Sequence, residues 1–471
     1  MSLGNIFSLL IGLASVAIYV KILGVFVYAS IGTVLALFNV VERFDITYRF
    51  ALLEEKRNMA RKRTPHHQNL STLYGSVVIS NIALAILLVL LAAVLAFGIY
   101  KNHSLFPLYI IGGLAFLISR INDFLFEFLR VNGRELVVQK ASTAGALAGL
   151  ATGATLLLLV KAGALSFFAG MLTSSLLIYV MLLKDSSRIA RFRLQFDSAR
   201  FLRLLKNSIR HDYISKMISP RSIWGVGLLV SSFYLEPFSM GILTLITVIC
   251  REVLRYFYIL IVHLPPLYSS ALARKGKEMA GKMAKNISLV LLTLTCFAVI
   301  LSIIFAETFF GLFPGIGAAG AIPLLVLGMA SCLLIVSFTA FQMYVFTLDF
   351  KLQNKINTIL FAAFIGFLFP LLGAFGLPGV IWLYFAYALI RALLLWLTLK
   401  KLHPGLLGMD VAVLSVVAFA SVAVAMLTYK GAITPLFSTV CVFFLGVILI
   451  SRKGAIITAA RKTILESETF K

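Results

Sequence analysis

Residues 237–261 read PFSMGILTLITVICREVLRYFYILI, a run long enough to cross a hydrocarbon core of about 30 Å as a helix. Its first half carries no charge, whereas its second half contains Arg251, Glu252 and Arg255. Comparable apolar runs recur along the chain of 471 residues, of which 61% are hydrophobic and 13% charged. Soluble domains have about 25% charged residues. Because a span in lipid must satisfy its own backbone hydrogen bonds, the sequence predicts an all-α, polytopic membrane protein.

The hydrophobic pattern predicts about 14 transmembrane helices. Their expected ranges are 5–23, 25–41, 73–99, 105–128, 136–160, 164–183, 213–235, 238–262, 285–306, 320–346, 354–373, 376–399, 409–428 and 433–450. A long basic segment divides the first six helices from the other eight, as in transporters built of two similar halves. We therefore expect four parts: an N-lobe (1–183), a cytoplasmic amphipathic linker (184–212), a C-lobe (213–400), and two further helices with a cytoplasmic tail (401–471).

The basic residues predict the orientation in the membrane. Alternate loops and the C-terminal tail hold 34 of the 42 lysines and arginines, and the opposite loops hold only Lys21, Lys101, Lys161 and Lys430. By the positive-inside rule, both termini of this multi-pass protein lie on the cytoplasmic side of the cytoplasmic (inner) membrane. The net charge of +24 is then a topology signal and an attraction to anionic membrane lipids, so no nucleic-acid partner is expected.

Four basic residues are left over from this count of loops and tail, in the predicted helices 105–128, 238–262 and 376–399: Arg120, Arg251, Arg255 and Arg391. Counted from the outer ends of their helices, they share a depth of roughly 20–25 Å. An arginine near a helix centre costs at least about 2.5–3.5 kcal/mol on insertion scales. Their common depth therefore predicts a polar, water-accessible interior, and guanidinium groups suit phosphate because each donates two parallel hydrogen bonds. Snorkelling to the headgroups is the alternative for Arg255 and Arg391.

Three acidic residues accompany these arginines: Asp123, Glu127 and Glu252. Arg120, Asp123, Glu127 and Arg130 follow one another at spacings of 3, 4 and 3, which predicts one charged stripe on a helix. The acids either neutralise arginines within the bundle or couple transport to protons or cations. At the cytoplasmic edge, solvation would account for the charge of Glu42.

No pattern of catalytic or metal-binding residues appears. The four cysteines fall inside apolar runs without CxxC spacing, so we interpret them as core residues. The histidines form no HExxH motif, and the chain has neither a GxSxG motif nor a P-loop. We expect a protein that is not an enzyme and that needs no cofactor or metal.

Several stretches resemble the polysaccharide flippases (Wzx type) of the multidrug/oligosaccharidyl-lipid/polysaccharide exporter (MOP) superfamily. They are VKILG (20–24), YLEPFSMGILTLI (234–246), LPPLYSSALARKGKE (264–278) and the segment 347–389 around the turn GAFGLPG. The resemblance covers most of the chain and includes the helix count. It implies two six-helix lobes around a cationic cavity that opens alternately to each side.

The resemblance also implies a substrate, a polyprenyl-pyrophosphate-linked oligosaccharide, and a process that involves polysaccharide polymerase and glycosyltransferases. The pyrophosphate would bind to Arg120, Arg251, Arg255 and Arg391, with Lys21 attracting it at the outer side. Two alternatives stay open. One is a small-molecule/cation antiporter of the same superfamily, and the other is a non-transporting membrane subunit of a polysaccharide export assembly.

Overall fold

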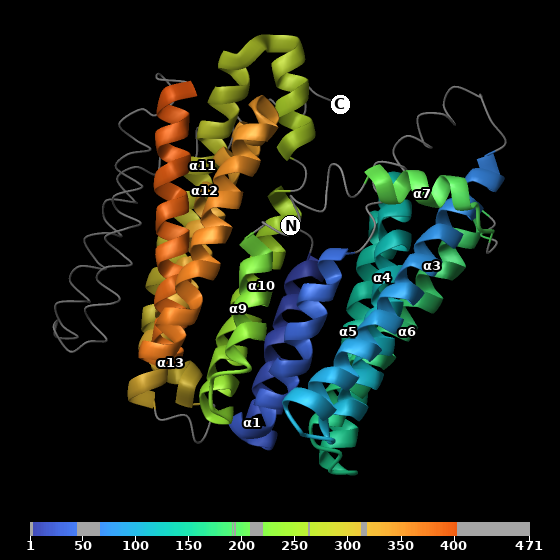
Figure 1. Cartoon of the computed structure of the whole chain (residues 1–471). Coiled ribbons are helices and arrows are strands. Elements are labelled where there is room, and N and C mark those ends of the chain that lie inside the picture. The colour runs from blue at the N-terminus through green and yellow to red at the C-terminus, as the bar shows by residue number, and fades with distance from the viewer. Residues whose placement is uncertain are drawn as a thin grey trace. The chain divides into compact units, whose positions relative to one another are not determined.

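The computed structural model describes residues 3–44, 66–190, 192, 195–207, 220–261, 264–311 and 318–402 (Figure 1). Every regular element in these ranges is helical, and seven of the helices are long and apolar enough to cross a membrane. The prediction of an all-α polytopic membrane protein is therefore confirmed. The predicted helices 409–428 and 433–450 lie outside the described residues.

The described chain forms two compact units, residues 1–244 and 245–471, whose boundary falls inside helix α10. The predicted lobes and linker have other boundaries and stay predictions. The first unit contains α1 (Leu3–Val41), η1 (Glu42–Phe44), α3 (His66–Ala93), η2 (Val94–Ile99), α4 (Leu105–Val131), α5 (Glu135–Leu158), α6 (Ala164–Ser187), α7 (Ser198–Asn207), α9 (Pro220–Ser231) and the start of α10 (Pro237–Ile261). The second contains the rest of α10, α11 (Leu264–Gly311), α12 (Ala318–Leu348) and α13 (Phe350–Leu402).

Two of these helices are hairpins that reverse at a single glycine. Gly24 in α1 has φ 75° and Gly376 in α13 has φ 56°, a left-handed conformation that glycine adopts without a Cβ penalty. Both glycines fall at short turns that the sequence predicts, between helices 5–23 and 25–41 and between helices 354–373 and 376–399. The prediction of these turns is confirmed.

Helix α11 begins earlier than the sequence predicts. Residues 264–278 read as a connecting loop, but the structure makes them helical from Leu264, with a break at Gly276 (φ 79°). Tyr268 and Ala271 are fully buried at helical spacing, and Tyr268 lies edge-to-face on Tyr344 of α12 with ring centroids 5.8 Å apart. The segment is helical because one face has a partner to pack against.

Helices α5 and α6 approach closely along a row of glycines in α5. Gly145, Gly149 and Gly153 are spaced four apart and are all buried. A Cβ at Gly149 would lie 2.7 Å from the carbonyl oxygen of Gly170 in α6, and a Cβ at Gly170 would lie 2.6 Å from the carbonyl oxygen of Gly149. Such small-residue contacts let the backbones of two membrane helices touch, which is a main source of their association.

Replacement of Gly149 by alanine is expected to destabilise the protein by about 1–3 kcal/mol, because the added methyl group must push α5 away from the backbone of α6. Thermal unfolding in detergent measures the loss. The matched control is Gly366→Ala in α13, where a Cβ would have no heavy atom within 4 Å. Alanine also favours helices more than glycine does, so equal melting temperatures for Gly149→Ala and Gly366→Ala would contradict the tight contact.

Helix α1 also packs against α9 and against the start of α10 (Figure 1). Gly241 of α10 faces the backbone of Val25, since a Cβ there would lie 2.2 Å from the carbonyl oxygen of that residue. Gly32 faces the side chain of Thr244 in the same way. The first unit thus joins α1 to residues 220–244, which the sequence assigns to the other lobe.

Candidate functional site

Arg120 lies in the second half of α4, and two carboxylates neutralise its charge. Its Nη2 atom lies 2.7 Å from Oδ2 of Asp123, one turn further along the helix. Its Nη1 atom donates a hydrogen bond of 3.1 Å to Oε1 of Glu42, which follows α1. The guanidinium also lies over the ring of Phe116, 5.5 Å from its centroid. The side chain is only 17% exposed, so this network holds a largely buried cation between α1 and α4.

The rest of the predicted stripe on α4 forms a second ion pair. Arg130 Nη1 lies 3.3 Å from Glu127 Oε1, three residues away. The sequence leaves open whether these acids neutralise arginines or couple transport to an ion, and in the structure Asp123 and Glu127 each form an ion pair with an arginine. Glu42 was interpreted as a solvated residue. Its contact with Arg120 needed the long-range packing of α1 on α4, which no local pattern reveals.

Arg391 is the predicted site residue with the most unusual surroundings. It lies in the second half of α13 and is 2% exposed. Its Nη2 donates a hydrogen bond to Oε1 of Gln342 in α12, while its Nε has no hydrogen-bond partner in the described ranges. The hydroxyl of Tyr387, one turn earlier, is also buried and makes no hydrogen bond within the part of the chain that the structure describes. Among the residues that the structure describes, no carboxylate pairs with Arg391, so its charge is buried against neutral groups.

Further polar side chains lie at the same level of the second unit. Phe364 contacts Tyr384 and Tyr387, with ring centroids 5.5 and 6.1 Å away, and this contact sets the register of the α13 hairpin. The register brings Asn357 level with Arg391. Asn357 accepts a hydrogen bond from Gln353, and both amides are almost fully buried. Buried amides in a membrane helix are costly unless they serve an interaction, so they mark a polar interior near Arg391.

The sequence analysis does not single out the amides of residues 342, 353 and 357, of which only Gln353 lies in a predicted connection, between helices 320–346 and 354–373. The sequence does contain a signal for these amides. Gln353 and Asn357 are four residues apart and therefore share a helix face, and Gln342 is the only amide in α12. What the sequence could not give is the pairing of Gln342 with Arg391, since 49 residues separate them.

The other predicted site residues are placed less completely. Arg251 is half-buried in α10, and it directly follows the buried Cys250. The side chains of Glu252 and Arg255 lie outside the described residues.

Lys21 is exposed on α1, three residues before the turn at Gly24. Arg120 belongs to the first unit, and Arg251 and Arg391 belong to the second. A single cavity that contains all of them stays a prediction.

Of the four cysteines, Cys250 and Cys332 are free and buried, as expected of core residues. In the described residues no group of His, Cys, Asp and Glu could hold a metal ion.

The fold is that of known membrane transporters. No protein-family model and no curated protein matches this chain. Among solved structures, the lipid II flippase MurJ in an inward closed conformation is similar with a TM-score of 0.68, at 15% identity over 97% of this chain and 99% of that one. An inward-facing multidrug resistance MATE transporter of the MOP superfamily has a TM-score of 0.57, at 14% identity over 86% and 96%.

A third solved structure extends the comparison to eukaryotes. The MATE transporter AtDTX14 has a TM-score of 0.52, at 14% identity over 89% of this chain and 94% of that one. Sequence identity this low shows a shared fold, and the coverage shows that the likeness spans nearly the whole of each protein. The chain therefore shares the fold of these solved transporter structures.

Proposed function

We propose that this protein is a flippase that moves a polyprenyl-pyrophosphate-linked oligosaccharide from the cytoplasmic to the outer leaflet by alternating access. The observation that carries the proposal is the buried Arg391, whose partners among the described residues are neutral. A buried cation without an acid is strongly unfavourable unless an anion joins it. A pyrophosphate is such an anion, and guanidinium groups match its oxygen geometry.

The contrast with Arg120 supports this assignment. Glu42 and Asp123 already neutralise Arg120, so it has less charge to offer a substrate in this conformation. Arg251, to which the count along the predicted helices gives a similar depth, is the second cation of the proposed site. The substrate site proposed here is therefore centred on Arg391 and Arg251, with Arg255 on the same helix, and Arg120 joins it only if its ion pairs open.

The antiporter alternative predicts a different charge balance. A site for cationic drugs should bury acids in neutral surroundings, whereas the described part of the second unit buries an arginine among amides.

The proposed orientation, with both termini cytoplasmic and the protein in the inner membrane, follows from the distribution of basic loops. Polysaccharide polymerase and glycosyltransferases are the proposed partners in the same process.

Translocation of a labelled lipid-linked glycan in proteoliposomes tests the proposal. The wild-type chain should expose the glycan on the opposite face of the vesicle, and Arg251→Ala and Arg255→Ala should each slow this by at least about tenfold, because a hydrogen bond to a charged group contributes about 1.5–3 kcal/mol. Lys282→Ala, at an exposed ion pair with Glu278, is the control and should not slow it. Efflux of a cationic dye without glycan movement would favour the antiporter, and no movement of either would favour the non-transporting subunit.

A further inference from the structure

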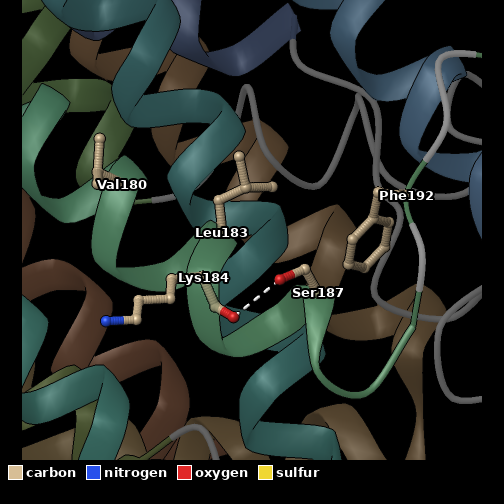
Figure 2. A pocket seen from close by; sticks show the side chains of 5 residues that line it. All are labelled: Val180, Leu183, Lys184, Ser187 and Phe192. Atoms are coloured by element: carbon tan, nitrogen blue, oxygen red, sulfur yellow. Dashed lines mark hydrogen bonds between the residues drawn. The ribbon is translucent and has the colours of Figure 1, made fainter.

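One side of α6 presents apolar side chains to the membrane and ends at a cation. Leu176 and Val180 are 45% and 59% exposed, although they lie in a helix apolar enough to span. Lys184 follows Val180 by four residues, and Figure 2 shows the two side chains on the same side of the helix. The exposed apolar stripe therefore leads directly to the ammonium group of Lys184.

The length of α6 puts that ammonium at headgroup depth. Lys184 lies twenty residues after the first residue of α6, Ala164. At about 1.5 Å per residue this is about 30 Å, the thickness of the hydrocarbon core. In the proposed topology this end of α6 lies in the cytoplasmic leaflet. Lys184 is thus level with the phosphates of the lipids in that leaflet.

A pocket of about 430 Å³ opens at this position. Its lining residues are Val180, Leu183, Lys184, Ser187 and Phe192 (Figure 2). Three of them are apolar and two are polar, which is the composition that an amphipathic ligand requires. The Ser187 hydroxyl donates a hydrogen bond of 2.8 Å to the carbonyl oxygen of Lys184, so its oxygen lone pairs stay available to accept a further bond.

The charge of Lys184 is not used within the described part of the chain. The neighbouring Arg188 pairs with Asp185 at 3.2 Å, whereas the ammonium of Lys184 has neither an ion pair nor a hydrogen bond to any described residue. Asp185, the acidic residue nearest to Lys184 in the sequence, is therefore already paired with Arg188. The pocket combines an apolar wall with an uncompensated positive charge.

The wall formed by Phe192 is a fixed part of the fold. Its ring lies 5.0 Å from Phe128 in an edge-to-face arrangement and 5.2 Å from Tyr74. The backbone of Gln195 then crosses Gly75 so closely that a Cβ there would lie 2.1 Å from its carbonyl oxygen. Phe192 and Gln195 thus pack against α3 and α4, and Phe192 forms the aromatic wall of the pocket.

We infer that this pocket binds an anionic phospholipid of the cytoplasmic leaflet. The phosphate pairs with the ammonium of Lys184, a headgroup hydroxyl donates to Ser187, and an acyl chain lies along Val180 and Leu176. This binding site is separate from the substrate site around Arg391. It depends on the proposed topology only for the name of the leaflet.

Native mass spectrometry of the full chain, released from nanodiscs of phosphatidylglycerol, tests the inference. The wild-type protein should retain one more phosphatidylglycerol than Lys184→Gln, whose affinity should fall about fivefold. Lys140→Gln is the matched control, because Lys140 is an exposed lysine near the start of α5, at the same end of the α5–α6 pair. It should retain lipid like the wild type. Equal retention by Lys184→Gln and the wild type would overturn the inference.

Two further measurements separate a lipid site from a general anion site. Val180→Trp keeps the charge but fills the pocket, so it should also lose the retained lipid. Soluble glycerol phosphate should not displace the lipid, and nanodiscs of zwitterionic phosphatidylcholine should show no difference between the wild type and Lys184→Gln. Displacement by glycerol phosphate, or equal retention of phosphatidylcholine by the wild type, would reject an anionic phospholipid as the occupant.

Discussion

Replacement of Arg391 by glutamine is expected to slow glycan-lipid translocation by roughly ten- to a hundredfold while the melting temperature stays the same or rises. The loss of transport follows because hydrogen bonds to a charged group contribute about 1.5–3 kcal/mol. The unchanged or higher melting temperature has a separate cause, the removal of a buried charge. Arg391 is 2% exposed and has a neutral partner in Gln342, so its removal takes away a buried charge without stranding an acid.

The combination of the two measurements identifies the role of Arg391. A structural arginine would lower the melting temperature and transport together, whereas a substrate-binding arginine lowers transport alone. Arg391→Lys keeps the charge but loses the planar fork, so it should fall between the wild type and Arg391→Gln. Lys401→Gln removes a charge from an exposed position on the same helix and serves as the control. Full transport by Arg391→Gln would remove Arg391 from the substrate site.

The fold was largely predictable because the pattern that marks a membrane helix lies within one short segment of sequence. Apolar runs of spanning length and the turns at Gly24 and Gly376 are features of short segments, and the structure has helices and reversals there. The helix at 264–275 was not predicted, because its polar and small residues become helical through contacts such as that of Tyr268 with Tyr344. Of the four arginines that the depth argument selected, Arg391 is buried and Arg120 and Arg251 are half-buried, and the side chain of Arg255 lies outside the described residues.

The partners of those arginines were beyond the sequence. Arg120 meets Glu42 across 78 residues, and Arg391 meets Gln342 across 49. Both contacts depend on how two helices pack against each other. The spacing of residues within a single segment predicts neither of them. This is why the sequence could rank all four arginines alike, whereas the structure separates a neutralised one from one with neutral partners.

A cross-link between α1 and α10 is expected to stop translocation almost completely. Phe26 and Phe238 have ring centroids 5.6 Å apart, beside the Gly24 turn of α1 and at the start of α10, which the proposed topology places outside. Cysteines at both positions should therefore react with one short, reducible bifunctional thiol reagent. Phe26 precedes residue 183 and Phe238 follows residue 213, so the pair joins the two predicted lobes. Alternating access requires these lobes to separate at the outer side, and the link forbids it.

The test needs a chain without its four native cysteines, and its control is a pair within one predicted lobe. Tyr19 and Phe167 have ring centroids 5.1 Å apart, on α1 and α6. Cysteines there should cross-link equally well and leave the rate as it was before the reagent. Reduction should restore translocation in the Phe26 and Phe238 pair. If transport continues after that pair is fully linked, α1 and the start of α10 move together. The moving boundary then lies after residue 244, where the compact units of the structure divide, rather than at the predicted linker.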